Sequence, residues 1–120
     1  MFIRTKNYEN CIQRVKIEIG KEVGLDEESE AYIVLKELPT LEMLQLKDAT
    51  DKGEEETLKI FKQLLPQIIT EHNFYEDEEG NKKMSNVDIA SLIFESITLT
   101  MKVVQGYTKA AFFSHPQKRD

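Results

Sequence analysis

The sequence has one cysteine, no tryptophan, three prolines and five glycines among its 120 residues. The single cysteine, Cys11, excludes a disulfide within the chain and favours a reducing compartment. The longest apolar runs span only a few residues, far short of the ~20 that a membrane-spanning helix needs, and we expect no membrane contact. The first residues turn polar within three positions, which argues against a signal peptide. We therefore expect one globular domain over residues 1–120, with flexible ends at 1–10 and 114–120.

Basic residues are scarce, since 16 lysines and arginines stand against 22 acidic residues and the net charge is −6. An acidic chain is a poor general binder of nucleic acid, because phosphate contacts need clustered basic side chains. Residues 21–81 carry seventeen acidic and six basic residues, whereas both ends are mildly basic. This distribution is typical of a solvated surface, and it can also support head-to-tail self-association or docking on a basic partner.

Two short segments have the pattern of β-strands. Residues 14–19 alternate apolar and charged side chains, and residues 31–37 are rich in β-forming residues. Residues 20–30 are polar and contain two glycines, so they predict a loop across which the two strands pair antiparallel. A two-stranded hairpin is marginal alone, so we expect it to pack on helices or on another chain.

A short helix is predicted after the hairpin. Pro39 ends the second strand, and Thr40 is placed to cap a helix over residues 41–48. Residues 49–53 then predict a linker, in which Asp51 is the expected N-cap of the next helix.

The next helix begins with three consecutive glutamates, 54–56, which favour the positive end of the helix dipole. Pro66 is expected to kink or restart this helix, because proline cannot donate a backbone hydrogen bond. Its apolar side consists of Leu58, Phe61, Leu65, Ile68 and Ile69.

A long apolar helix is predicted over residues 86–105. Ser85 and Asp88 match a capping box at its start, and Gly106 is the expected stop. Its apolar stripe comprises Ile89, Ala90, Ile93, Phe94, Ile97, Met101, Val103 and Val104. We therefore predict a mainly α fold of the α+β class, with three to four helices around this central helix and a small N-terminal hairpin. An all-α fold is the alternative.

Residue patterns typical of catalysis are missing. There is neither a glycine-rich phosphate loop nor a nucleophile elbow. The acidic run at 77–81 departs from a calcium loop, because Tyr75 and Asn86 occupy two ligand positions. His72 and its acidic neighbours offer too few ligands for a structural metal. We expect no enzyme activity, no metal and no cofactor.

Four aromatic residues lie outside the main apolar stripes and are candidate partner-binding residues: Phe74, Tyr75, Phe112 and Phe113. The alternative is that they fill the edge of the core. For Tyr75 we prefer that alternative, and for Phe112 and Phe113 the two interpretations stay open.

Three segments together resemble the tail assembly chaperones of long-tailed bacteriophages. These segments are residues 32–43 (YIVLKELPTLEM), residues 57–70 (ending FKQLLPQIIT), and residues 71–80 (EHNFYEDEEG) with the helix that Ser85 caps. The resemblance implies a small, helical, self-associating assembly factor without enzyme activity. Its implied partners are the tape measure protein and the tail tube protein, and its implied place is the cytoplasm of the bacterial host rather than the mature virion.

A second hypothesis is a small adaptor or regulatory protein of a mobile element that binds one host protein through Phe112 and Phe113. A third, a DNA-binding regulator, is disfavoured because the helix at 86–105 contains a single basic residue, Lys102.

Overall fold

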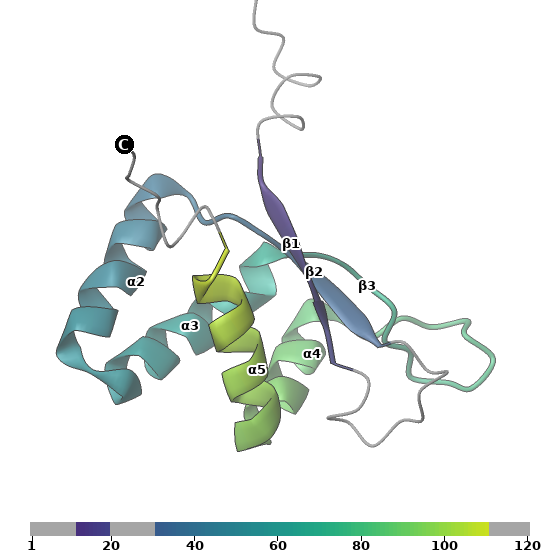
Figure 1. The fold of residues 1–120 in the computed structure, drawn as a ribbon. Coiled ribbons are helices and arrows are strands. Elements are labelled where there is room, and N and C mark those ends of the chain that lie inside the picture. The colour runs from purple at the N-terminus through teal and green to yellow at the C-terminus, as the bar shows by residue number, and fades with distance from the viewer. Residues whose placement is uncertain (1–11, 20–30, 111–120) are drawn as a thin grey trace, which may run out of the picture.

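The computed structural model describes residues 12–19 and 31–110. Its elements are β1 (Arg14–Glu18), β2 (Tyr32–Lys36), α2 (Thr40–Lys52), α3 (Glu54–Ile68), β3 (Ile69–His72), α4 (Asn86–Phe94) and α5 (Ile97–Thr108). The strands form an antiparallel sheet in the order β1-β2-β3, and the helices lie to one side of it (Figure 1). The predicted fold class, mainly α with an N-terminal hairpin, is confirmed.

The hairpin of β1 and β2 pairs as predicted. Ile17 lies opposite Ile33, and both side chains are buried. Lys16 and Glu18 point to the other face and are exposed, as strand alternation requires. The apolar side of the hairpin therefore faces the helices, while its polar side faces solvent.

The third strand, β3, was not predicted. It pairs antiparallel with β2 through a bulge between Val34 and Leu35. The apolar spacing of the preceding helix continues through Ile69, so the sequence pattern assigned that residue to the helix. In the structure Ile69 pairs with Leu35, and the Thr70 hydroxyl donates a hydrogen bond to the Val34 carbonyl at 3.2 Å. Pairing with β2, which is distant in the sequence, therefore places Ile69 in a strand rather than in the helix.

Helix α2 is longer than predicted. It runs from Thr40 to Lys52, so the linker at 49–53 is wrong, as is the Thr40 cap, because Pro39 occupies the N-cap position and makes no side-chain cap bond. Ala49 packs in the core, and an ion pair between Lys52 and Asp48 (3.2 Å) supports the last turn.

Gly53 separates α2 from α3, so the Asp51 cap is also wrong. The Gly53 N–H donates to the Ala49 carbonyl (3.2 Å), and its carbonyl accepts from the Thr57 hydroxyl (2.8 Å). The three glutamates do lie in the first turn of α3, as expected. One glycine thus ends one helix and begins the next.

Helix α3 continues through Pro66 to Ile68, so the predicted restart at the proline is wrong. The proline falls in the last turn, so its missing N–H and its ring disturb only the end of the helix. Asn86 satisfies two of the carbonyls at this end, since its side-chain amide donates to Pro66 O (3.1 Å) and Ile69 O (3.0 Å). The start of α4 therefore caps the end of α3.

The predicted central helix at 86–105 is two helices. Ser85 caps α4 as predicted, accepting from the Asp88 N–H at 3.1 Å. The chain then breaks after Phe94, and Ser96 caps α5 by accepting from the Leu99 N–H at 3.3 Å. The stop at Gly106 is wrong, because α5 continues to Thr108. A serine side chain can hydrogen-bond to nearby backbone groups in place of the helical partners, and Ser96 in this way ends the first helix and begins the second.

The core centres on Phe61 of α3 and Tyr107 of α5, both fully buried. Their ring centroids are 5.5 Å apart, and Phe94 lies 6.4 Å from Phe61. The Tyr107 hydroxyl donates to the Lys36 carbonyl at 3.0 Å, which joins α5 to the sheet. Burial raises the pKa of Tyr107, so the hydroxyl keeps its proton and remains a donor.

Several predicted features lie outside the described residues: Cys11, the loop at 20–30, Phe112 and Phe113, and the ends at 1–10 and 114–120. Within 12–19 and 31–110, no helix combines the length and the hydropathy that crossing a membrane requires.

Candidate functional site

The acidic turn after β3 is organised by Asp77. Its carboxylate accepts from the backbone N–H groups of Asn81 (3.0 Å) and Lys82 (3.2 Å), and Gly80 adopts φ +74°. Across the described part of the chain, no three His, Cys, Asp or Glu side chains are grouped to hold a metal. The carboxylate of Asp77 therefore acts on its own backbone and closes the turn.

The structure separates the two aromatic residues predicted next to this turn. Phe74 is buried and its ring lies edge-on to His72, with centroids 6.3 Å apart. Tyr75 is 42% exposed, with the Lys83 ammonium 5.9 Å from its ring centroid. The preference for placing Tyr75 at the edge of the core is therefore wrong: its side chain turns outward, while that of the preceding Phe74 turns inward.

His72 holds the start of this turn. Its Nδ1 accepts from the Phe74 N–H at 3.1 Å, which requires the neutral ring with an unprotonated Nδ1. Burial lowers the pKa of His72 below 6.5, and the charge of Lys83 lowers it further, while a backbone hydrogen bond with Met84 acts in the opposite direction. The imidazole is thus maintained as a neutral acceptor.

We expect stability to fall as the pH drops below 6.5, the ordinary pKa of histidine. The unfolded chain takes up the proton at a higher pH than the folded chain, so acid favours unfolding. Urea denaturation at pH 7 and pH 5.5 measures the change. The His72→Gln variant, whose side-chain carbonyl can still accept, should lose much less stability over this interval. A pH dependence that instead disappears in His115→Gln would contradict the assignment to His72.

The outer face of the sheet has a polar row that crosses all three strands. The Lys16 ammonium lies 4.6 Å from the ring centroid of Tyr32, and the Tyr32 hydroxyl donates to the Glu71 carboxylate at 2.8 Å. This hydrogen bond to Glu71 raises the pKa of Tyr32, and desolvation adds to the effect. The row stabilises cross-strand pairing and keeps this face hydrophilic.

The most exposed large apolar side chains of the described part lie on helices rather than at the aromatic turn. Leu41 and Leu44 on α2 are 76% and 56% exposed, and we call them the leucine pair. They lie three residues apart, one turn of helix, and so share one side of α2. Leu46 and Ala49 occupy a different side, which is buried. Helix α2 therefore has two apolar sides, and only one of them is covered.

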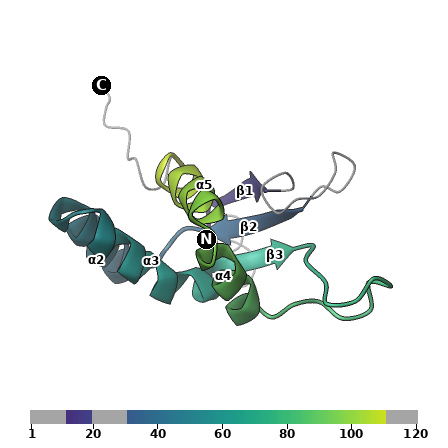
Figure 2. The same ribbon diagram turned by 90° about the horizontal axis from the view of Figure 1, so that it is seen from below.

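The leucine pair lies on an arm. Helices α2 and α3 pack against each other and extend away from the sheet (Figure 2). The tip of this arm is acidic, with Asp51 and glutamates 54–56 all exposed. The leucine pair was missed from the sequence, because the buried side of the short helix was not assigned. The available signal was that the leucines and the methionine of residues 41–46 are distributed around the whole circumference of the helix.

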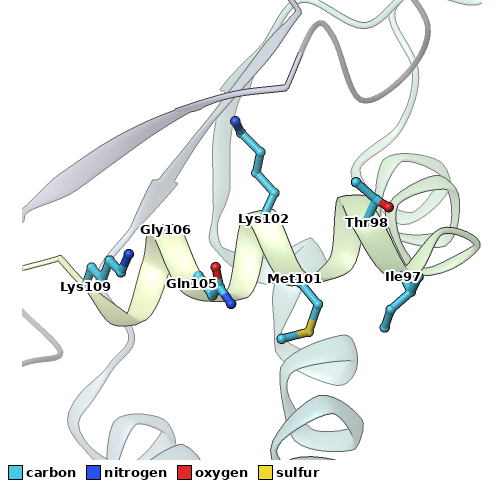
Figure 3. Close-up of a pocket in the computed structure, with 7 residues that line it drawn as sticks. All are labelled: Ile97, Thr98, Met101, Lys102, Gln105, Gly106 and Lys109. Carbon is cyan, nitrogen blue, oxygen red and sulfur yellow. The ribbon is translucent and has the colours of Figure 1, made fainter.

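A second apolar surface lies on α5, where an open hollow of about 590 Å³ follows the helix flank (Figure 3). Ile97 and Met101 line it one turn apart, together with Gln105 and two lysines. Ile97 was predicted to be buried, but it is 70% exposed. The break at Ser96 rotates α5 relative to α4, so the apolar stripe does not continue along one face.

Neither a protein-family model, nor a curated protein, nor a solved structure matches this chain.

Proposed function

We propose that this protein is a non-enzymatic tail assembly chaperone of a long-tailed bacteriophage or prophage, acting in the host cytoplasm on the tape measure protein. The observation that carries the proposal is the leucine pair, 76% and 56% exposed on an arm with an acidic tip. Exposed apolar residues rimmed by polar ones are typical of surfaces that bind other proteins. Leu41 also belongs to the segment 32–43 that resembles such chaperones.

The leucine pair and the acidic tip suit the task of binding a tape measure protein. A tape measure protein is long, helical and apolar, and it is exposed until the tail tube encloses it. The leucine pair would cover apolar side chains of one helical turn on the partner, as in helix-in-groove recognition. The acidic tip of the arm, Asp51 with glutamates 54–56, would remain in water. Like charges on neighbouring copies would then oppose aggregation of the coated partner. Release during tube assembly fits the expected absence of the chaperone from the mature virion.

The proposal is tested by co-expressing the chain with the tape measure protein of the same phage and measuring how much of it is soluble and retained. We expect the double variant Leu41→Ser/Leu44→Ser to weaken binding by about tenfold per leucine, the usual contribution of a buried leucine side chain. The matched control is Gln45→Ser/Lys47→Ser, which changes exposed polar residues of the same helix.

Two outcomes would contradict the proposal. One is a wild-type chain that neither retains nor solubilises the tape measure protein. The other is a leucine double variant that binds as well as its control. A parallel variant, Phe112→Ser/Phe113→Ser, examines the adaptor hypothesis, in which binding of a host protein depends on that end of the chain.

A further inference from the structure

Strand β1 has one edge that no other described strand pairs with. The Ile19 N–H donates to the Ala31 carbonyl and the Gln13 carbonyl accepts from the Glu37 N–H, both at 2.9 Å. Because hydrogen-bonding direction alternates along an antiparallel strand, the backbone groups of residues 13, 15, 17 and 19 point toward β2. Those of Arg14, Lys16 and Glu18 point away from it. An edge of this kind can pair with another strand.

The side chains of β1 make this edge complementary to itself. Consider a second copy related by a two-fold axis at Ile17, so that the two β1 strands run antiparallel. On the outer face, Lys16 then lies opposite Glu18 of the second copy, and the pair occurs twice. On the inner face, Ile17 lies opposite Ile17, and Val15 lies opposite Ile19. Opposite charges and apolar pairs both stabilise such a ladder.

The neighbouring register is less favourable. A two-fold axis at Lys16 would also satisfy the outward backbone groups and would pair Arg14 with Glu18 twice, but it would place Lys16 directly opposite Lys16 of the second copy. Like charges directly opposite each other destabilise a strand pair. The charge pattern therefore favours the register centred on Ile17, which has two attractive pairs and no repulsive one between charged residues 16 and 18.

The other edge of the sheet is a poorer template. Strand β3 has four residues, and its pairing with β2 contains a bulge. Pairing of β1 with β3 of another copy would also extend without limit, whereas pairing of β1 with β1 closes as a dimer. The regular, five-residue β1 is the edge that suits a symmetric interface.

Helix α5 packs beside this edge. It lies against β1 (Figure 2), so closely that a Cβ on Gly106 would be 3.2 Å from Cδ1 of Ile17. Lys102 and Lys109 lie on the side of the α5 hollow nearer Gly106, whereas Ile97 and Met101 point away from the strands (Figure 3). A two-fold axis through β1 brings the two copies of α5 to the same side of the joined sheet. The interface therefore rests on the paired strands, with α5 beside them.

We propose that two copies of this chain associate through their β1 strands, in the register that pairs Lys16 with Glu18, to form a continuous six-stranded sheet. The proposal deepens the self-association expected under the proposed function, but it does not require the tape measure protein.

Sedimentation velocity of the full chain over a range of concentrations measures the dimer. We expect Lys16→Glu and Glu18→Lys each to weaken dimerisation about tenfold, because each change turns two attractive cross-strand pairs into two repulsive ones. The double variant Lys16→Glu/Glu18→Lys exchanges the charges and should return the dimer to within about threefold of wild type. In the register centred on Lys16, the double exchange would instead oppose Arg14 with a lysine and give no rescue.

A control and a backbone variant complete the test. Lys62→Glu makes the same charge change on an exposed position of α3 and should leave the dimer intact. Lys16→Pro removes an N–H that points away from β2, so it should abolish the dimer while far-UV circular dichroism remains that of the folded chain.

A wild-type chain that stays monomeric at the highest attainable concentration would overturn the proposal. So would single charge variants that dimerise like wild type, or a double variant no better than the singles. Binding of the tape measure protein is measured separately on the same variants. Monomeric variants that still bind it leave the proposed function standing, and a dimer that fails to bind it leaves the β1 interface standing.

Discussion

Replacing Phe61 with alanine should lower the free energy of unfolding by about 3–5 kcal/mol, the range for removing a fully buried phenylalanine. Phe61 is fully buried where α3 meets α5, and its ring packs on Tyr107 (5.5 Å) and Phe94 (6.4 Å). The substitution removes the apolar transfer free energy and leaves a cavity that rigid helices cannot fill. Against the 5–15 kcal/mol typical of small domains, this loss brings the chain close to unfolding at physiological temperature.

Urea denaturation followed by circular dichroism measures the change in unfolding free energy. The matched control is Phe94→Ala, because Phe94 belongs to the same aromatic cluster but is only partly buried. We expect a clearly smaller loss for Phe94, since less of its surface is removed from water on folding. Equal losses at the two positions would contradict the assignment of Phe61 to the centre of the core.

Replacing Gly53 with alanine should cost about 1–3 kcal/mol of stability through the backbone alone. Gly53 has φ 130° and ψ 174°, a region that essentially only glycine adopts. A Cβ at this position would meet no atom within 4 Å, so no steric contact contributes to the loss. The residue separates the two helices of the arm, and a strained connection would also disturb the side of α2 that presents the leucine pair.

Gly80 supplies the matched comparison for Gly53. Its φ of +74° lies in the left-handed region, and a Cβ there would also meet open space. Asparagine tolerates that region, so Gly80→Asn should cost little, whereas Gly53→Asn should cost about as much as Gly53→Ala. Thermal and urea denaturation of the three variants check this pattern. Tolerance of asparagine at Gly53 would show that the inter-helix connection adopts another conformation.

Local signals predicted some of the elements that local chemistry controls, although the Ser96 cap was missed. The alternation of Val15, Ile17 and Ile19 with charged residues indicates the first strand of the hairpin, because a half-buried strand shows this pattern whatever it packs against. Ser85 was correctly assigned as a cap, since its hydroxyl and the Asp88 N–H are three residues apart. These features depend on neighbours in the sequence, so the sequence contains the evidence for them.

Errors arose where a distant partner decided the outcome. Ile69 continues a helical apolar spacing, yet it belongs to β3 because β2 offers it a hydrogen-bonding edge. Gly106 resembled a helix stop, but its missing Cβ serves the close approach of α5 to Ile17. The contact joins residues 89 positions apart, and no window of neighbouring residues contains that information.

The candidate site shows the same difference between what neighbouring residues indicate and what distant contacts decide. Phe74 and Tyr75 were named together from their place beside an acidic turn, and the structure buries one and exposes the other. The leucine pair was not singled out, because apolar residues at helical spacing are usually core residues. Only the packing of α3 on α2 shows that the side of α2 with Leu46 and Ala49 is buried, while Leu41 and Leu44 remain exposed.

The sequence by itself determined a mainly α chain with an acidic middle, an N-terminal hairpin and a serine-capped helix after an acidic turn. Its single cysteine excludes a disulfide within the chain, and it contains no recognised metal-binding motif. Composition, charge and the Ser85 cap are properties of single residues or of close neighbours, so they can be read directly. Only the tertiary structure decided where helices break, which side of each helix is covered, and which strand edge no other described strand pairs with. Those outcomes depend on contacts between distant segments, whose free energy appears only after the chain has packed.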